Sequence, residues 1–290
     1  MAVADSGPFF AHLNAPDTDP AGVRRIQAEF QRRNPGYEIE VHGAAAALQA
    51  ALVPRVVFVQ SNTARARAGD QDSEVGVGDV VLLRAGQSLS LDHEMLLVVF
   101  RTPVPFPGEL PAFLRPDWDE RITDVVGGCA TEEGAYRRIV LTWLGKNGPY
   151  LYHALNAHRV RITDSFTHYH PPEGGFDEFY LVQMTKPGAR LITSDRREQI
   201  ERPQELGTDQ AVGLLKEHSL AEGDLVYIPR GIVHRGLGGV LAHVITVPGF
   251  KPGAEIGVDH HLRAINERLA LRSDEALPFH EPASHAPLIK

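Results

Sequence analysis

The spacing of apolar residues predicts a helix near each end of the chain. Within residues 18–33 the apolar positions recur at helical spacing, Pro20 stands near the start, and a Pro-Gly pair follows at 35–36. A proline in the first turn and a Pro-Gly pair after the last turn are typical helix boundaries, so this segment is expected to be a helix. Residues 257–272 show the same spacing and predict a second helix.

Between these helices the pattern changes to short apolar or alternating runs separated by Gly, Pro, Asn and Asp, which is typical of strands joined by turns. The expected strands are 37–41, 54–60, 80–83, 95–101, 138–144, 150–155, 158–162, 178–184, 189–193, 211–217, 224–228 and 241–247. A passage rich in Pro, Gly and acidic residues, 102–135, is expected to cross a domain boundary with one short helix at most. The last residues, 278–290, are expected to be a tail or a packing arm.

The chain also carries an internal repeat. Residues 78–108 align without a gap on residues 223–253, and nine of the 31 aligned positions are identical, including spaced Gly and Pro. Gly-Asp turns and valines are common in β proteins, but an ungapped match of this kind indicates duplication. The repeat therefore predicts two similar β domains, which we place at 1–125 and 126–290.

Composition and charge exclude several classes of function. The 290 residues suffice for about two domains, and the net charge of −8 argues against nucleic acid and against a basic membrane-surface role. No apolar run reaches about 18 residues, so no transmembrane helix is expected, and residues 1–10 lack the features of a secretory signal. The single cysteine, Cys129, excludes disulfides within the chain and is expected to be a buried or linker thiol. A cytoplasmic location is the default expectation.

The residues best suited to chemistry lie in two separated stretches of the second half. His168 and His170 stand two positions apart, so in a strand both imidazoles point to the same side. Glu178 opens the next expected strand, and a hairpin can return its carboxylate beside them. His234, after a Pro-Arg-Gly turn, can supply a third imidazole. Three neutral nitrogens and one carboxylate suit one divalent transition-metal ion, Fe(II), Mn(II), Ni(II), Cu(II) or Zn(II), and leave positions open for water or substrate.

These stretches resemble the two motifs of the cupin superfamily, HxH followed by Glu and G-x5-P-x-G-x2-H. The second motif matches at every fixed position through its histidine: Gly223, Pro229, Gly231 and His234. The first departs from the pattern, because Ile162 replaces its leading Gly, the spacer before Glu178 is seven residues long, and the closing Gly comes late, at 188. Glu173 is an alternative acid in the turn, but Glu178 is preferred because it begins a strand.

The resemblance implies an all-β fold of two cupin-type double-stranded β-helix (jelly-roll) barrels with a few peripheral helices. It also implies that only the C-terminal barrel binds metal, since Leu89 stands at the repeat position of His234 and Arg84 at that of Pro229. A leucine side chain cannot ligate a metal ion. The chain is therefore expected to be a bicupin with a structural N-terminal barrel, and the analogy with cupins suggests a homodimer.

Other residues of the second half are candidates with two interpretations each. Tyr180 shares the parity of Glu178, so it is either a catalytic residue that hydrogen-bonds a substrate or a packed tyrosine. His243, on the strand after the second motif, is either a catalytic acid or base in the pocket or a hydrogen-bonded core histidine. His158 shares the parity of His168, but a bend between them can reverse its face, so the sequence does not decide its direction. Arg159 has the opposite parity and is expected to form ion pairs at the surface.

Three kinds of function fit a cupin metal site of this composition. The resemblance favours a metal-dependent oxygenase or dioxygenase that acts on a small organic substrate. The alternatives are a non-redox isomerase, lyase or decarboxylase in which the ion polarises a carbonyl, and a non-catalytic small-molecule-binding barrel. The polarity of the pocket separates the substrate classes, because an apolar wall favours an aromatic or apolar substrate and converging Lys or Arg favour an acid.

Overall fold

The computed structural model describes residues 7–128, 130 and 134–290, so the expectations for Cys129 and for the first six residues lie outside the described residues. The helices in these ranges are α1 (Pro20–Arg33), α2 (Arg197–Ile200), α3 (Thr208–Ala211) and α4 (Asp259–Leu269). The two longer ones, α1 and α4, confirm the two predicted helices. Within the described part of the chain, no helix has both the length and the apolar character needed to cross a membrane.

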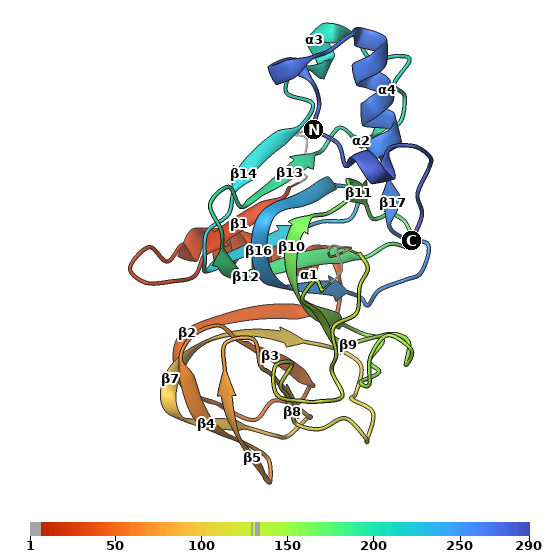
Figure 1. Cartoon of the computed structure of the whole chain (residues 1–290). Helices are drawn as coiled ribbons and strands as arrows, with labels where there is room; N and C mark the ends of the chain where they lie inside the picture. Colours follow the sequence, from red (N-terminus) through yellow and green to blue (C-terminus); the bar gives the residue numbers. More distant parts are fainter. Residues whose placement is uncertain (1–6, 129, 131–133) are drawn as a thin grey trace.

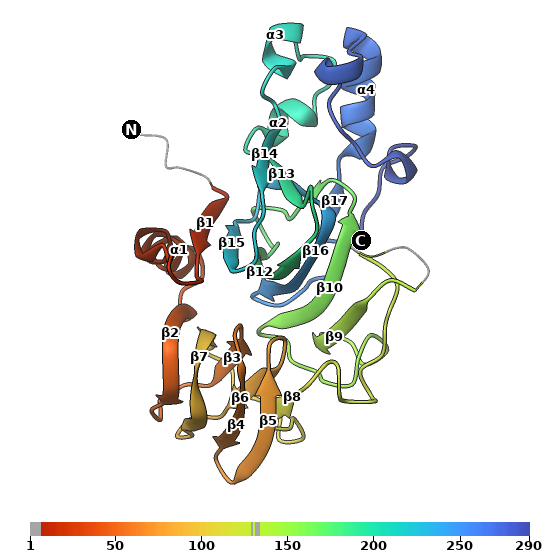
Figure 2. The same ribbon diagram turned by 60° about the vertical axis from the view of Figure 1, so that its left-hand side comes forward.

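The strands form two antiparallel sheets, and the sheet that contains β2 to β8 lies below the other sheet in both Figure 1 and Figure 2. The N-terminal barrel contains β2 (Glu38–Leu48), β3 (Arg55–Val59), β4 (Thr63–Ala68), β5 (Gln71–Gly76), β6 (Val80–Leu83), β7 (Leu89–Arg101) and β8 (Phe113–Leu114). The C-terminal barrel contains β1 (Phe9–His12), β9 (Arg137–Leu141), β10 (Asn156–Asp164), β11 (His168–Tyr169), β12 (Asp177–Thr185), β13 (Arg190–Ser194), β14 (Lys216–Ser219), β15 (Asp224–Ile228), β16 (Val233–Val247) and β17 (Ile256–Gly257). Because β1 pairs with β15, residues 9–12 extend the second sheet. The division at residue 125 stays a prediction.

Strand pairing confirms the internal repeat. In the N-terminal barrel β3 pairs with β6 and β7, and in the C-terminal barrel β12 pairs with β15 and β16. Arg55 pairs with Leu83 and Arg101, and Glu178 pairs with Ile228 and Thr246. The two pairs of partners are equivalent in the repeat, because Ile228 and Thr246 stand 145 residues after Leu83 and Arg101. The two barrels therefore share one topology. The predicted all-β fold of two cupin-type barrels with a few peripheral helices is confirmed.

At the two positions that the repeat compares, the N-terminal barrel has no metal-ligating side chain. Arg55 occupies the place of Glu178, and Leu89 occupies the place of His234. Leu89 is 1% exposed and belongs to the core of this barrel with Val57 and Val99. An isobutyl group offers no ligand atom, and a guanidinium repels a cation, so this barrel cannot build the same site.

Replacing Leu89 with Ala is expected to lower the free energy of unfolding by about 2–4 kcal/mol, because the change leaves a cavity in a packed core. Metal content is expected to stay unchanged. Urea unfolding and elemental analysis of the same protein sample measure the two effects separately. Loss of metal from Leu89→Ala would contradict the assignment of a purely structural role to this barrel.

An aromatic core joins the two barrels. Phe30 of α1 meets Phe100 of the N-terminal barrel at 6.0 Å between ring centres and Phe179 of the C-terminal barrel at 5.0 Å, both edge to face. The rings of Phe179 and Tyr227 are stacked at 4.7 Å. All four side chains are buried in a single cluster. Edge-to-face pairs of this kind add to the burial of apolar area, so α1 fastens the barrels together.

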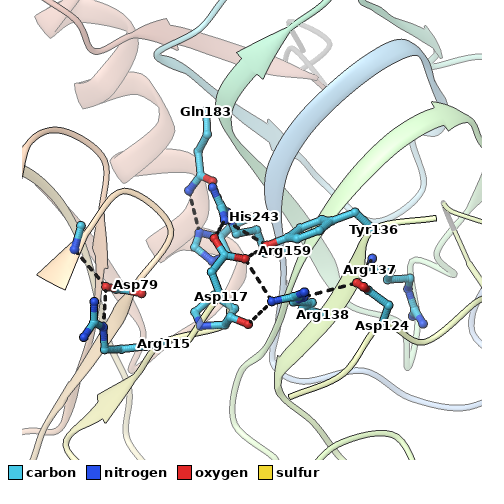
Figure 3. A network of polar contacts seen from close by, with 12 residues as sticks. Asp79, Arg115, Asp117, Asp124, Tyr136, Arg137, Arg138, Arg159, Gln183 and His243 are labelled. Carbon is cyan, nitrogen blue, oxygen red and sulfur yellow. Dashed lines mark hydrogen bonds and ion pairs between the residues drawn. The ribbon is translucent and has the colours of Figure 1, made fainter. Parts of the chain in front are cut away.

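A network of polar contacts lies where the C-terminal barrel meets the N-terminal barrel (Figure 3). Arg159 of β10 donates a hydrogen bond to Gln183 Oε1 at 2.7 Å and forms an ion pair with Asp117. It also lies against Gly78 of the N-terminal barrel, where a Cβ atom would come within 2.5 Å of the Arg159 Nε atom. Arg159 is 8% exposed, so the expected surface pairing is wrong. The outer face of β10 is covered by the other barrel, which sequence parity alone does not reveal.

Several element predictions differ from the structure. Strands β4 and β5 were not predicted, because β4 buries only alanines between Thr and Arg and carries a weak apolar signal. Residues 150–155 make an isolated bridge through Leu151 in place of a strand, and 211–217 divides between the end of α3 and the start of β14. The described residues of 102–135 contain β8 and no helix. Residues 278–290 pack back on the barrel through the bridge between Ile289 and Ile256.

Candidate metal centre

Three strands of the C-terminal barrel bring four predicted side chains together. His168 lies on β11 directly opposite His234 of β16, and His170 follows β11. Glu178 is the second residue of β12. All four side chains are buried, and each offers one ligand atom such that these atoms lie within 4.8 Å of one another. Glu173 is exposed in the turn, so Glu178 is the acid that joins the histidines.

Backbone carbonyls orient two of the rings. His168 Nδ1 donates to the carbonyl of Phe166 at 3.0 Å, and His234 Nδ1 donates to the carbonyl of Ile232 at 3.0 Å. A carbonyl only accepts, so each proton is on Nδ1 and each Nε2 keeps its lone pair. Neither Nε2 atom has a hydrogen-bond partner among the described residues. This is the arrangement in which metal-binding imidazoles are usually held.

The carboxylate of Glu178 completes the cluster. Its Oε1 lies 3.3 Å from His234 Nε2, and its Oε2 lies 3.8 Å from His170 Nε2. Buried polar atoms without hydrogen bonds are costly, and here several point at one another. Three nitrogens and one carboxylate oxygen are the donor set of a divalent transition metal, and bonds of about 2.1 Å to a central ion would span about 4.2 Å. Small side-chain movements would bring the four atoms within bonding distance.

The protonation of the cluster also fits a cation. Burial, and next the neighbouring His234, lowers the pKa of His168 and of His170 well below the usual 6.5, so both rings are neutral at pH 7. Burial has the largest single influence on His234 and acts to lower its pKa, but the carboxylate of Glu178, whose Oε1 lies 3.3 Å from His234 Nε2, outweighs it and raises the pKa. Metal ligands must be deprotonated, and a cation between His234 and Glu178 would favour the neutral ring.

Tyr180 lies on the same face of β12 as Glu178, as predicted. Its side chain is 0% exposed and belongs to the apolar interior of the C-terminal barrel, together with Val182 and Val226. It does not line the cavity described below. Its proposed role as a catalytic residue stays a prediction.

His243 is buried and hydrogen-bonded in the core and does not line the cavity described below, and its role as a catalytic residue stays a prediction. Its ring meets Phe58 of the N-terminal barrel edge to face at 5.0 Å, and its Nδ1 accepts a hydrogen bond from Gln183 Nε2 at 3.0 Å (Figure 3). Burial, and next the charge of Arg159, lowers the pKa of His243 to about 3. His243 stands nine positions after His234, so strand alternation directs the two rings to opposite faces of β16.

A cavity of about 460 Å³ opens beside the cluster and reaches Glu178. One wall is apolar and includes Trp143 and Phe250, and the rim includes Arg137 and Lys290. Sequence reasoning missed these four residues, because they come from a loop, from a strand start and from the last residues of the chain. Spacing gives no signal for side chains that only tertiary structure brings to one cavity.

His158, Thr246 and Glu255 also line the cavity. His158 Nε2 and Thr246 Oγ1 are buried and have no hydrogen-bond partner among the described residues. The sequence did not decide which face of its strand His158 is on, and the structure places it at the cavity that Glu178 also lines. Burial, and next the charge of Glu178, raises the pKa of Glu255 to about 7, although Lys290 and Arg137 act to lower it. Polar atoms of this kind require a partner, and a bound molecule in the cavity can supply one.

The two barrels of one topology, and the site formed by the two motif stretches of the second barrel, define a protein of two similar β barrels. Among the described residues, the candidate metal centre lies in the C-terminal barrel. No family model matches the chain, and a search of curated proteins finds no match.

Solved structures with a similar fold include an oxalate decarboxylase from Bacillus subtilis, with 14% identity over 83% of this chain and 74% of that chain and a TM-score of 0.45. Another is the 11S globulin from Wrightia tinctoria, with 12% identity over 83% and 84% and a TM-score of 0.49. A third is AerE from Microcystis aeruginosa, with 11% identity over 73% and 86% and a TM-score of 0.46. Similarities at this level carry no inference about activity.

Proposed function

We propose that the C-terminal barrel binds one divalent transition-metal ion through His168, His170, Glu178 and His234, and that the protein is a metal-dependent oxygenase for a small organic substrate. One observation carries the proposal: the four ligand atoms converge and one of them, on Glu178, lines a cavity of about 460 Å³. A structural metal site is closed by protein ligands, whereas a catalytic site keeps an open position toward substrate. Fe(II), Mn(II), Ni(II), Cu(II) and Zn(II) all suit this donor set.

The ion would supply open coordination positions and, when it is redox-active, the electron chemistry. The residues of the chain hold and shield the reacting molecule. The stacked rings of Trp143 and Phe250 exclude water from one side of the cavity. Glu255, with a pKa of about 7, is suited to hold or release a proton at its carboxylate during the reaction. We keep a homodimer and a cytoplasmic location as further proposals.

A non-redox metalloenzyme, an isomerase, lyase or decarboxylase, is the second candidate. Glu255 favours it, because a carboxyl group that titrates near neutral pH beside a Lewis-acid site suits proton transfer next to a polarised carbonyl. A non-catalytic small-molecule-binding barrel is the third candidate.

The oxygenase proposal predicts oxygen consumption by the Fe(II) form. The protein is loaded with Fe(II) without oxygen, mixed with aromatic acids, aliphatic acids or neutral compounds, and followed with an oxygen electrode. Substrate-dependent uptake is expected from the wild type and is expected to be absent from His234→Ala, which loses a ligand. Stoichiometric iron with no uptake in any class would contradict the oxygenase, and product formation without uptake would favour the second candidate.

A further inference from the structure

We infer that the cavity beside the metal centre selects a small planar aromatic acid, with its ring along the aromatic wall and its carboxylate at the cationic rim. The inference deepens the proposed function, since it names the substrate class of the same site. It rests on the aromatic wall, on the charge of the rim and on the unpartnered polar atoms of the cavity.

Two stacked rings line one wall of the cavity, and further buried rings behind them connect this wall to the metal cluster. Trp143 and Phe250 are stacked at 3.9 Å between ring centres, with planes 27° apart. Phe250 lies 5.2 Å from Phe176, and Phe176 lies 4.0 Å from the ring of His170. Offset stacking favours a planar partner over a branched aliphatic one. A flat ring against this wall would therefore be directed toward the predicted metal ligands.

The rim carries positive charge although the chain is acidic. Arg137, Lys146 and Lys290 line the cavity, against the carboxylates of Glu178 and Glu255, while the net charge of the whole chain is −8. Glu178 faces the histidines, so the three cations stand against one further side-chain carboxylate, that of Glu255. A concave site of positive charge in a negative protein concentrates anions, and Arg and Lys are the usual carboxylate partners.

Lys290 is fixed close to the metal cluster. Its ammonium lies 4.6 Å from the centre of the Phe166 ring, and that ring is stacked on His168 at 4.4 Å. The backbone of Lys290 exchanges two hydrogen bonds of 3.0 Å with the backbone of Glu255. These contacts hold the Lys290 ammonium at a defined place in the lining of the cavity.

Unpartnered polar atoms complete the site. Thr246 is 4% exposed, pairs with Glu178 in the sheet register, and has no hydrogen-bond partner for its Oγ1 among the described residues. Trp143 Nε1 and His158 Nε2 are also buried and have no hydrogen-bond partner among the described residues. Groups of this kind in a ligand cavity fix the orientation of a polar molecule, and a substituted aromatic acid offers them acceptors and donors.

Trp143 can report binding without any catalytic turnover. The chain has two tryptophans, and the other, Trp118, is 73% exposed, so Trp118→Phe leaves Trp143 as the single tryptophan, whose emission is followed. Benzoate, benzyl alcohol and acetate are titrated into this variant, both free of metal and loaded with Zn(II). We expect saturable change of emission with benzoate, at an affinity about tenfold or more above that of either other compound, because charge-assisted bonds and stacking each contribute.

Lys290→Gln and Arg137→Gln are expected to weaken benzoate binding about tenfold, and Lys216→Gln, a cation exposed on β14, serves as the matched control. Should Arg137→Gln fail to fold, Lys290→Gln alone decides. Equal binding of benzoate and benzyl alcohol, binding of acetate as tight as benzoate, or equal affinities in Lys290→Gln and Lys216→Gln would overturn the inference. Elemental analysis of the same samples reports metal loading independently, so failure of the metal proposal and failure of the aromatic-acid inference are distinguishable.

Discussion

His234→Ala is expected to abolish tight metal binding. The substitution removes the imidazole that lies opposite His168 and closest to Glu178, and so removes one of four ligands. Even loss of a residue that only supports a ligand costs about 10- to 100-fold in affinity, so loss of a ligand is expected to exceed 100-fold. Calorimetric titration and elemental analysis after dialysis measure the loss.

The stability of the folded protein is expected to follow the metal. An ion present at about a thousand times its dissociation constant stabilises the wild type by about 4 kcal/mol, and this increment is expected to vanish in His234→Ala. His93→Ala is the control, because His93 is an exposed histidine of the N-terminal barrel. Unchanged metal content in His234→Ala would show that the four side chains do not form the binding site. Glu178→Ala is expected to weaken binding, since the carboxylate supplies charge as well as an oxygen ligand.

Glu255→Gln is expected to make the metal-free protein more stable at pH 8 and to leave its stability unchanged near pH 4. Burial, and next the charge of Glu178, raises the pKa of Glu255 from 4.5 to about 7. A carboxyl group whose pKa is higher in the folded state binds more protons folded than unfolded between these values. The free energy of unfolding therefore falls as pH rises from about 4.5 to 7, and the loss is complete above pH 7.

The size of this effect follows from the shift. One pKa unit corresponds to about 1.4 kcal/mol, and partial exposure of the carboxylate reduces the total to roughly 2–3 kcal/mol. Urea unfolding of both proteins with a chelator at pH 4, 6 and 8 measures it, and Glu94→Gln, at an exposed position of the N-terminal barrel, is the control. A constant difference between Glu255→Gln and wild type at all three pH values would show that Glu255 does not titrate in this range.

Much of the fold was predictable because it depends on local patterns. The helical spacing around Phe30 predicted α1, and the ungapped repeat predicted two similar β domains. In the structure β6 and β7 pair with β3 as β15 and β16 pair with β12. The order of strands within a sheet is then restricted by their short turns and by the antiparallel register. The weak signal of β4 shows the limit of this reasoning, since alternating alanine and arginine resembles a loop as much as a strand.

The sequence by itself determined which side chains meet in the candidate metal cluster, because the HxH parity, the turn before Glu178 and the second motif are local features of the chain. Only the tertiary structure decided what surrounds them. It turned His243 toward Phe58 and Gln183 because a second barrel covers that face, and it brought Trp143, Glu255 and Lys290 from three distant segments to one cavity. The physical reason is that a strand's two faces are set by its own alternation, while the partner that covers each face is set by packing between distant parts of the chain.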